Sequence, residues 1–429
     1  MGLSATALRL AAAHPHALLA VAPGATAVRL EVERRLRERG WPEAAAAADA
    51  DLVVVCGSPG RQLADAVERL RLQVPAPSAQ VEIVAVGDVE PALERAQARL
   101  VDLTLQHRGA VERHRQRERR RHEPTGHETG HDGGDGHGNG HGGGHGADGG
   151  DGDRGGHEGH GEGAVVAGLR LASRAPDRDG LKLDRLHLPL GPVLPDWPAG
   201  LVVRTSLQGD VLQEVEAAVL DGGDRAPEPP FWSEPWLRAA SGERVGAGEA
   251  ARRRAAAHLD SLGRLLTVAG WEAAAVAARR LRDDLLVGVE ARALAPRLRP
   301  FARRVRASRL LRWSLAGLGV LDRKAVIEHG VAGPALRAGG DVWARLLGWL
   351  EETEAALSEV GSGELLAGDE RVEGPRGRVG GERPPSLALL EVLPDLLLGS
   401  ELAGARLIVA SLDPDPDELL AERPVAAHG

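Results

Sequence analysis

Asp51-Leu52-Val53-Val54-Val55-Cys56 is an almost continuous apolar run that ends in the turn Gly57-Ser58-Pro59-Gly60. A short apolar run followed by Gly and Pro is typical of a strand buried on both faces of a parallel sheet. Similar patterns extend outward on both sides: strands at 17–22 and 81–87, and helices at 27–39, 61–72 and from Pro91 onward. The alternation of strands and helices over residues 1–106 therefore predicts an α/β domain with a parallel sheet.

Composition narrows the possible functions. The 429 residues suffice for two or three domains, and the net charge of -9 predicts no global attraction to nucleic acid or anionic lipid. No apolar run approaches the roughly 20 residues of a membrane span, and the N-terminus lacks the pattern of a signal peptide. Cys56 is the single cysteine. It excludes an internal disulfide, and we expect it to lie buried at the strand end. A cytoplasmic protein is predicted.

Residues 107–163 are predicted to be a disordered linker. It begins with the basic run 113–121 and continues with a Gly/His/Asp stretch over 126–163. Such a composition has too little apolar surface to offset its ordering entropy.

The histidines of this linker could bind nickel or zinc, but weakly, because the glycines prevent an organised helix. The candidate metal ligands are His127, His131, His137, His141, His145, His157 and His160. The alternative to a metal-binding linker is a soluble spacer that binds no metal.

Residues 164–429 are predicted to form an α+β unit, with a β-hairpin region followed by a helical bundle. Strand patterns cover 183–188 and 201–219, with Gly209-Asp210 at a hairpin turn. Helical patterns cover 248–268, 271–287, 292–313, 341–359 and 386–400. The acidic end, 413–418, is interpreted as an exposed tail.

Four stretches of this second region form an ordered series. They are Gly191-Pro192-Val193-Leu194-Pro195-Asp196-Trp197-Pro198-Ala199-Gly200 with Gly209-Asp210, Gly317-Leu318-Gly319-Val320-Leu321 with 333–340, Glu373-Gly374-Pro375-Arg376-Gly377, and 393–399 with 411–414. Together they resemble the large quinone-side subunit of bacterial NADH-quinone oxidoreductase (respiratory complex I), which implies a fold like that of nickel-iron hydrogenase large subunits. The first region, through 50–57 and 84–88, is similar to the small subunit that holds the terminal iron–sulfur cluster of the same complex. The chain therefore resembles a fusion of two neighbouring subunits.

The sequence departs from this family at the positions that carry its chemistry. The family reduces quinone with a loop histidine and a tyrosine, but the matching loop has Leu194 and then Pro198 or Ala199, and the chain has no tyrosine. Asp284 stands where a helix histidine would be expected. His187 is a possible substitute, although a histidine between leucines is more typical of an exposed strand position. A single cysteine cannot hold a four-iron cluster or a nickel-iron site, so no cofactor is expected.

Three functions remain open. The first is a degenerate, non-catalytic scaffold or accessory subunit of a membrane-associated oxidoreductase. Its partners would be other subunits of an NADH dehydrogenase or hydrogenase-type complex, in the cytoplasm or peripherally on the inner face of the plasma membrane. The second is an active, divergent quinone-reactive subunit that uses the cluster of another chain. The third is a metal-binding accessory protein acting through the histidine-rich linker.

Overall fold

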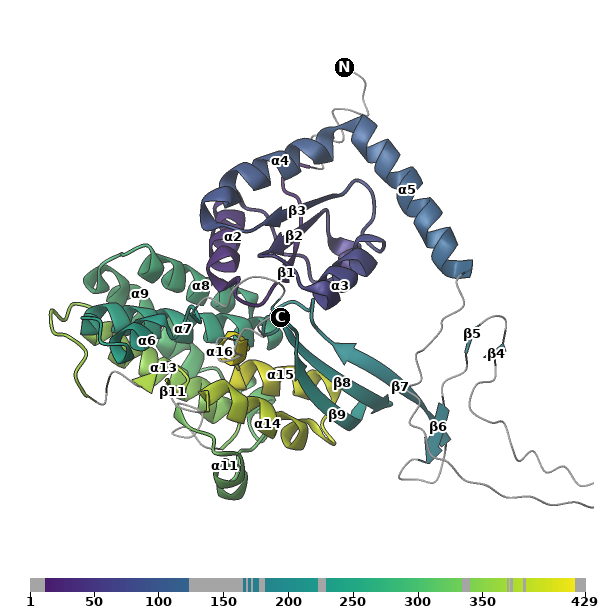
Figure 1. Cartoon of the computed structure of the whole chain (residues 1–429). Helices are drawn as coiled ribbons and strands as arrows, with labels where there is room; N and C mark the ends of the chain where they lie inside the picture. Colours follow the sequence, from purple (N-terminus) through teal and green to yellow (C-terminus); the bar gives the residue numbers. More distant parts are fainter. Residues whose placement is uncertain are drawn as a thin grey trace, which may run out of the picture.

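The computed structural model describes residues 12–122, 165–166, 169–170, 173–176, 182–222, 229–333, 340–368, 370, 373–380 and 383–420. The seven candidate histidines lie outside these residues, as does most of the family-like segment 333–340. Within the described residues, an N-terminal α/β unit packs against a larger unit of antiparallel strands and helices (Figure 1).

A three-stranded parallel sheet organises the N-terminal unit, as predicted. Its order is β1 (Ala17–Val21), β2 (Leu52–Cys56) and β3 (Ala79–Ile83). The central strand β2 is buried along its whole length, which explains its continuous apolar run. The unit also contains α2 (Thr26–Arg39), α3 (Arg61–Arg71), α4 (Val89–Val101) and short 3-10 turns at Ala47–Asp49 and Val86–Asp88. Gly57 follows β2 with φ of +82°, and a Cβ there would lie 2.5 Å from that of Ala25.

The disorder predicted from residue 107 onward is wrong for residues 107–122. Residues Leu103–His122 form one helix, α5, so the start of the predicted linker is helical. Arginine favours helix, and the helix is held at its side by the Arg71 guanidinium, which donates to Gln116 Oε1 at 2.6 Å. The disorder predicted for the rest of the linker falls on 123–163, outside the described residues.

The larger unit begins with antiparallel strands. Four of them pair in the order β6 (Ser173–Pro176), β7 (Lys182–Leu190), β8 (Leu201–Gln208) and β9 (Val211–Val219). Gly209 and Asp210 connect β8 to β9, which confirms the predicted hairpin turn. Two smaller pairs are β4 (Val165–Val166) with β5 (Leu169–Arg170), and β10 (Glu373–Gly374) with β11 (Gly377–Arg378).

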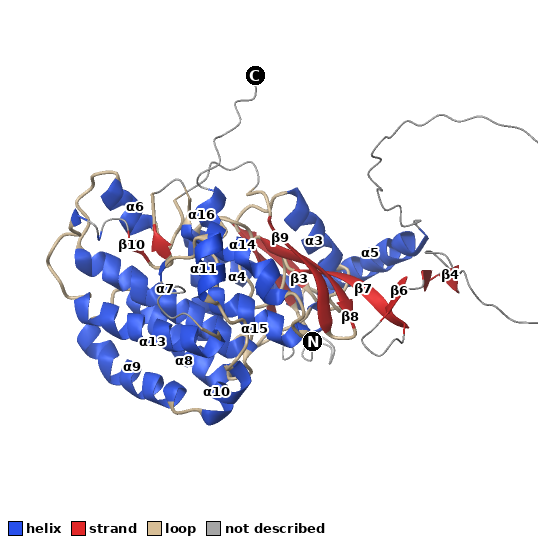
Figure 2. Cartoon of the chain, turned by 90° about the horizontal axis from the view of Figure 1, so that it is seen from below, coloured by secondary structure: helices blue, strands red, loops and turns tan. Residues whose placement is uncertain are grey.

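The helices pack around the long helix α7 (Ala247–Val268), which contacts α8 (Glu272–Leu286), α13 (Val342–Glu359) and α15 (Leu402–Leu412) (Figure 2). The helix expected over 292–313 is split into α9 (Ala291–Arg306) and α10 (Arg309–Leu315), because Ser308 Oγ accepts from Leu311 N and caps the second helix. The remaining described helices are α6 (Glu234–Ala240), α11 (Arg323–His329), α14 (Pro385–Leu397) and α16 (Asp417–Leu420). Among the described residues, no helix is long and apolar enough to cross a bilayer.

The acidic end of the chain is not an exposed tail, as the sequence had suggested. Asp413, Asp415, Asp417 and Glu418 are only 2%, 6%, 5% and 5% exposed. Asp417 accepts hydrogen bonds from Gly24 N at 2.7 Å and Thr26 Oγ1 at 3.1 Å, so this segment joins the larger unit to the N-terminal unit. A run of carboxylates is ordinarily solvated, but here backbone N–H groups and arginines from distant segments take the place of water.

Candidate functional site

The loop between β7 and β8, residues 191–200, faces the N-terminal unit. Gly191 has φ of +86°, and a Cβ there would lie 2.4 Å from Leu201 O. Only glycine fits such a position without strain. The Trp197 indole donates its Nε1 hydrogen to the same carbonyl at 2.9 Å, which fixes the loop against the start of β8.

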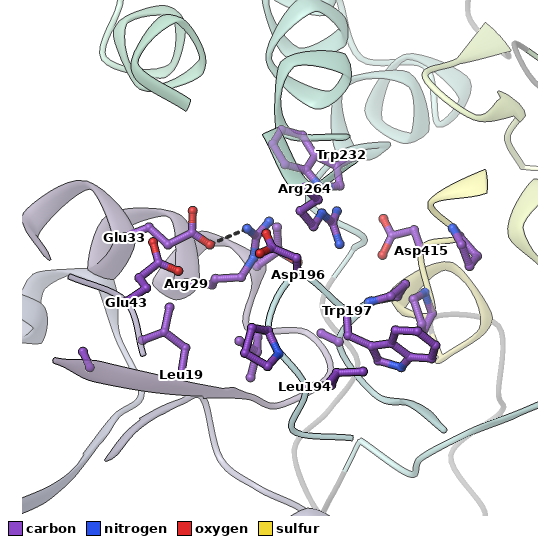
Figure 3. Close-up of a pocket in the computed structure, with 18 of the residues that line it drawn as sticks. Leu19, Arg29, Glu33, Glu43, Leu194, Asp196, Trp197, Trp232, Arg264 and Asp415 are labelled. Atoms are coloured by element: carbon purple, nitrogen blue, oxygen red, sulfur yellow. Dashed lines mark hydrogen bonds and ion pairs between the residues drawn. The ribbon is translucent and has the colours of Figure 1, made fainter. Parts of the chain in front are cut away.

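A pocket separates this loop from the N-terminal unit (Figure 3). Its empty volume is about 720 Å³, part of it open to solvent. The loop contributes the positions that depart from the family, Leu194, Pro198 and Ala199, and Leu19 lies across from them on β1. The charged residues that line it are Arg29, Glu33, Glu43, Asp196, Arg264, Arg376 and Asp415. The pocket thus has an aliphatic wall beside a strongly charged one.

The charged wall continues into a buried network of ion pairs between the two units. Three residues four positions apart on α2 share one helical face. Arg29 pairs with Asp260 of α7 at 2.8 Å, Glu33 with Arg282 of α8 at 2.8 Å, and Arg37 with Asp283 of α8 at 2.6 Å. Arg282 is fully buried, and Asp260 is 1% exposed.

Electrostatics keeps the carboxylates at the centre of this network ionised. Burial raises the pKa of Glu33, but the nearby Arg29 and Arg282 guanidinium groups outweigh burial, and the pKa lies below its ordinary value. Asp260 behaves in the same way, because Arg29, Arg264 and Arg282 together overcome its burial and lower its pKa. Desolvation of such pairs nearly cancels their attraction, so the network fixes geometry more than it adds stability.

A second group of ion pairs closes the pocket from the C-terminal side. Asp413 pairs with Arg264 at 2.9 Å and with Arg376 at 2.8 Å, and the Arg376 Nε–H also donates to the Asp413 carbonyl at 2.8 Å. Arg376 is 8% exposed, so its guanidinium is not a solvated surface group. The family-like stretch 373–377 instead holds the acidic end.

Asp415 is the unusual group in this pocket. Within the described residues its Oδ2 atom is buried without a hydrogen-bond partner, and the same holds for Nε of Arg264. The Arg264 and Asp415 side chains point into the same space in Figure 3. Burial raises the pKa of Asp415, and Asp413 adds to the effect. The carboxyl group therefore ionises less readily than an exposed aspartate, and it lies beside an arginine donor, an arrangement suited to a ligand oxygen.

The other residues proposed from the sequence lie elsewhere. His187 is exposed on β7 and does not line the pocket, while Asp284 pairs with Arg297 at the surface. Cys56 is buried, as expected, and burial raises the pKa of its thiol to about 12. Among the described residues there is no cluster of three or more His, Cys, Asp or Glu side chains suited to a metal ion.

Sequence reasoning missed Arg264 and Asp415 because they are far apart in the chain and no local motif contains them. One pattern could have identified the α2 face: charges of alternating sign at 29, 33 and 37 lie on a helix that must also cover a sheet. That pattern does not reveal its partners on α7 and α8.

No family model matches the chain, and no curated protein matches it. Among solved structures, a chain of the membrane-bound sulfane sulfur reductase, an archaeal respiratory membrane complex, superposes with a TM-score of 0.43 and 17% sequence identity. The superposition covers 55% of this chain and 98% of that chain. The function of the present chain must be argued from its own residues.

Proposed function

We propose that the chain is a non-catalytic scaffold or accessory subunit of a membrane-associated oxidoreductase, with the small-subunit-like and large-subunit-like units joined in one polypeptide. Its partners would be other subunits of an NADH dehydrogenase or hydrogenase-type complex. The proposal unites the sequence resemblance with the aliphatic character of the loop.

One observation supports this proposal most directly. The loop that resembles the quinone loop of the family packs toward the N-terminal unit, and it presents Leu194, Pro198 and Ala199 to the pocket. None of these side chains can donate a proton or a hydrogen bond. The arginines beside them already pair with carboxylates. Such a contact region holds two units in one geometry, which is what a scaffold requires.

The test uses the full chain in the cells that encode it. Affinity purification from membranes solubilised in mild detergent should recover the chain in stoichiometric amounts with the other subunits of one oxidoreductase complex. Deleting the chain should reduce the amount of assembled complex without changing turnover per assembled complex. Recovery of the chain alone, with assembly unaffected by its deletion, would refute the proposal.

Asp415 favours a second candidate, a divergent quinone-reactive subunit. Quinone reduction takes up two electrons and two protons, and the electrons would come from an iron–sulfur cluster of another chain. The Arg264 guanidinium would bind one quinone oxygen, the neighbouring Asp415 carboxyl would supply one proton, and water entering the open side of the pocket would supply the other. Here Asp415, rather than His187, would replace the lost histidine.

A substitution separates the two candidates. Asp415→Asn keeps the shape of the side chain and removes its acidic proton. On the scaffold proposal, turnover per assembled complex is unchanged, as it should be in the exposed control Asp395→Asn. On the second candidate, turnover falls by about 100-fold, the size typical of a lost general acid, while Asp395→Asn has no effect.

A further inference from the structure

Besides the basic run 113–121, positive charge is concentrated in a second segment of this acidic chain. Between residues 297 and 324, nine residues are Arg or Lys and a single one, Asp322, is acidic. The whole chain carries a net charge of -9. The segment spans the end of α9, all of α10 and the start of α11. The chain is acidic as a whole, but this segment is strongly basic, and it would attract negatively charged partners.

Helix α10 presents apolar side chains within this basic segment. Leu311 and Leu315 face the core, and their burial fixes the rotation of the helix. The opposite face carries Leu310 and Trp313, which are 73% and 80% exposed. Two large apolar side chains that are exposed on the same face of a helix form an apolar patch, and such patches are typical of interaction surfaces. Figure 2 places α9 and α10 at the edge of the molecule, away from the strands.

The arginines around these two side chains are available to a partner. Arg309 and Arg312 are exposed on α10, and Arg299 and Arg303 on the outer face of α9. Within the part of the chain that the structure describes, none of the four has a carboxylate within ion-pair distance, whereas Arg306 pairs with Glu354 at 2.7 Å. The exposed cations therefore surround a protruding pair of apolar side chains.

We propose that the α9–α10 surface, formed by Arg299, Arg303, Arg309, Leu310, Arg312 and Trp313, binds the surface of an anionic lipid bilayer. Arginines bind lipid phosphates, and tryptophan and leucine enter the boundary between headgroups and acyl chains. Nucleic acid or an acidic protein would satisfy the arginines, but neither requires Leu310 and Trp313 to project together. The inference depends on these residues alone and not on the proposed function.

The test is flotation of the purified full-length chain with vesicles. We expect binding to vesicles of phosphatidylcholine with about one third phosphatidylglycerol, and weak binding to pure phosphatidylcholine. Raising the salt concentration from 0.1 to 0.5 M should weaken binding, because screening lengths shorten. Arg309→Glu with Arg312→Glu should lower the partition coefficient at least 25-fold, at about fivefold for each lost arginine. Trp313→Ala should lower it about tenfold, through lost apolar burial.

The matched control is Arg61→Glu with Arg69→Glu, which changes charge equally at two exposed positions of α3. This variant should bind like the original chain, and circular dichroism should show all variants folded. Absence of binding to anionic vesicles, or binding that survives the α10 substitutions, would overturn the inference. So would equally tight binding to a DNA duplex that is lost with the two arginines but is unaffected by Trp313→Ala.

Discussion

Replacing Asp413 with asparagine tests the buried acidic end most directly. Asp413 is 2% exposed and accepts from Arg264 and Arg376. Its backbone is left-handed, with φ of 44°, a conformation that asparagine adopts readily, so the substitution changes charge without straining the chain. Removing one partner of a buried ion pair costs roughly 3–5 kcal/mol. Asp415 lies 3.9 Å from Arg376 and takes up part of the lost interaction, so we expect about 3 kcal/mol.

The assay is urea unfolding followed by tryptophan fluorescence, since Trp197 and Trp232 are buried beside the same pocket. In a thermal melt of the same variant, the midpoint should fall by about 6–12 °C, at about 2–4 °C for each kcal/mol. The control Asp395→Asn changes a contact between the Asp395 carboxylate, which is 68% exposed, and the His329 ring at 3.0 Å, and it should cost less than about 1 kcal/mol. Equal, small effects of the two substitutions would mean that the acidic end is solvated, and the description of the interface would fail.

Three further predictions follow from other parts of the molecule. Burial and Asp415 raise the pKa of Asp417 to about 7, so its folded-state proton stabilises the protein at low pH and is lost as the pH rises through 7. The free energy of unfolding should therefore decrease from pH 5 to pH 8, less steeply in Asp417→Asn; equal slopes would contradict this. Gly191→Ala should destabilise the chain by about 1–3 kcal/mol in urea, because its backbone conformation excludes a side chain, whereas Gly209→Ala, with open space around its Cβ, should cost less. Nickel or zinc binding is expected in the linker alone, so calorimetric titration of a chain lacking residues 126–163 should show no uptake, and equal uptake by both chains would place the metal site elsewhere.

The sequence predicts the elements of this fold better than their contacts. The strand 51–56 and the hairpin turn at Gly209-Asp210 could be predicted from local sequence. A strand that is buried on both faces requires a continuous apolar run, and a tight turn requires residues such as Gly and Asp. The helix α5 was missed because its charged residues lack an apolar stripe, although they favour helix. The acidic end was wrongly predicted to be an exposed tail, because a run of carboxylates is solvated unless arginines from distant segments contact it. No sequence pattern near Asp413 indicates that Arg264 and Arg376 are its partners.

The ion-paired contact between the two units gives a physical reason for their being part of one chain. Buried ion pairs such as Arg282 with Asp260 and Glu33 set orientation while contributing little net affinity, so two separate chains meeting through them would associate weakly. A covalent connection makes the same contact intramolecular, so the contact no longer depends on the concentration of a second chain. Loop-closure entropy rises by only about 0.6 kcal/mol for each doubling of length. We therefore infer that residues 123–164 serve to connect the two units, a role that tolerates changes of their sequence and length.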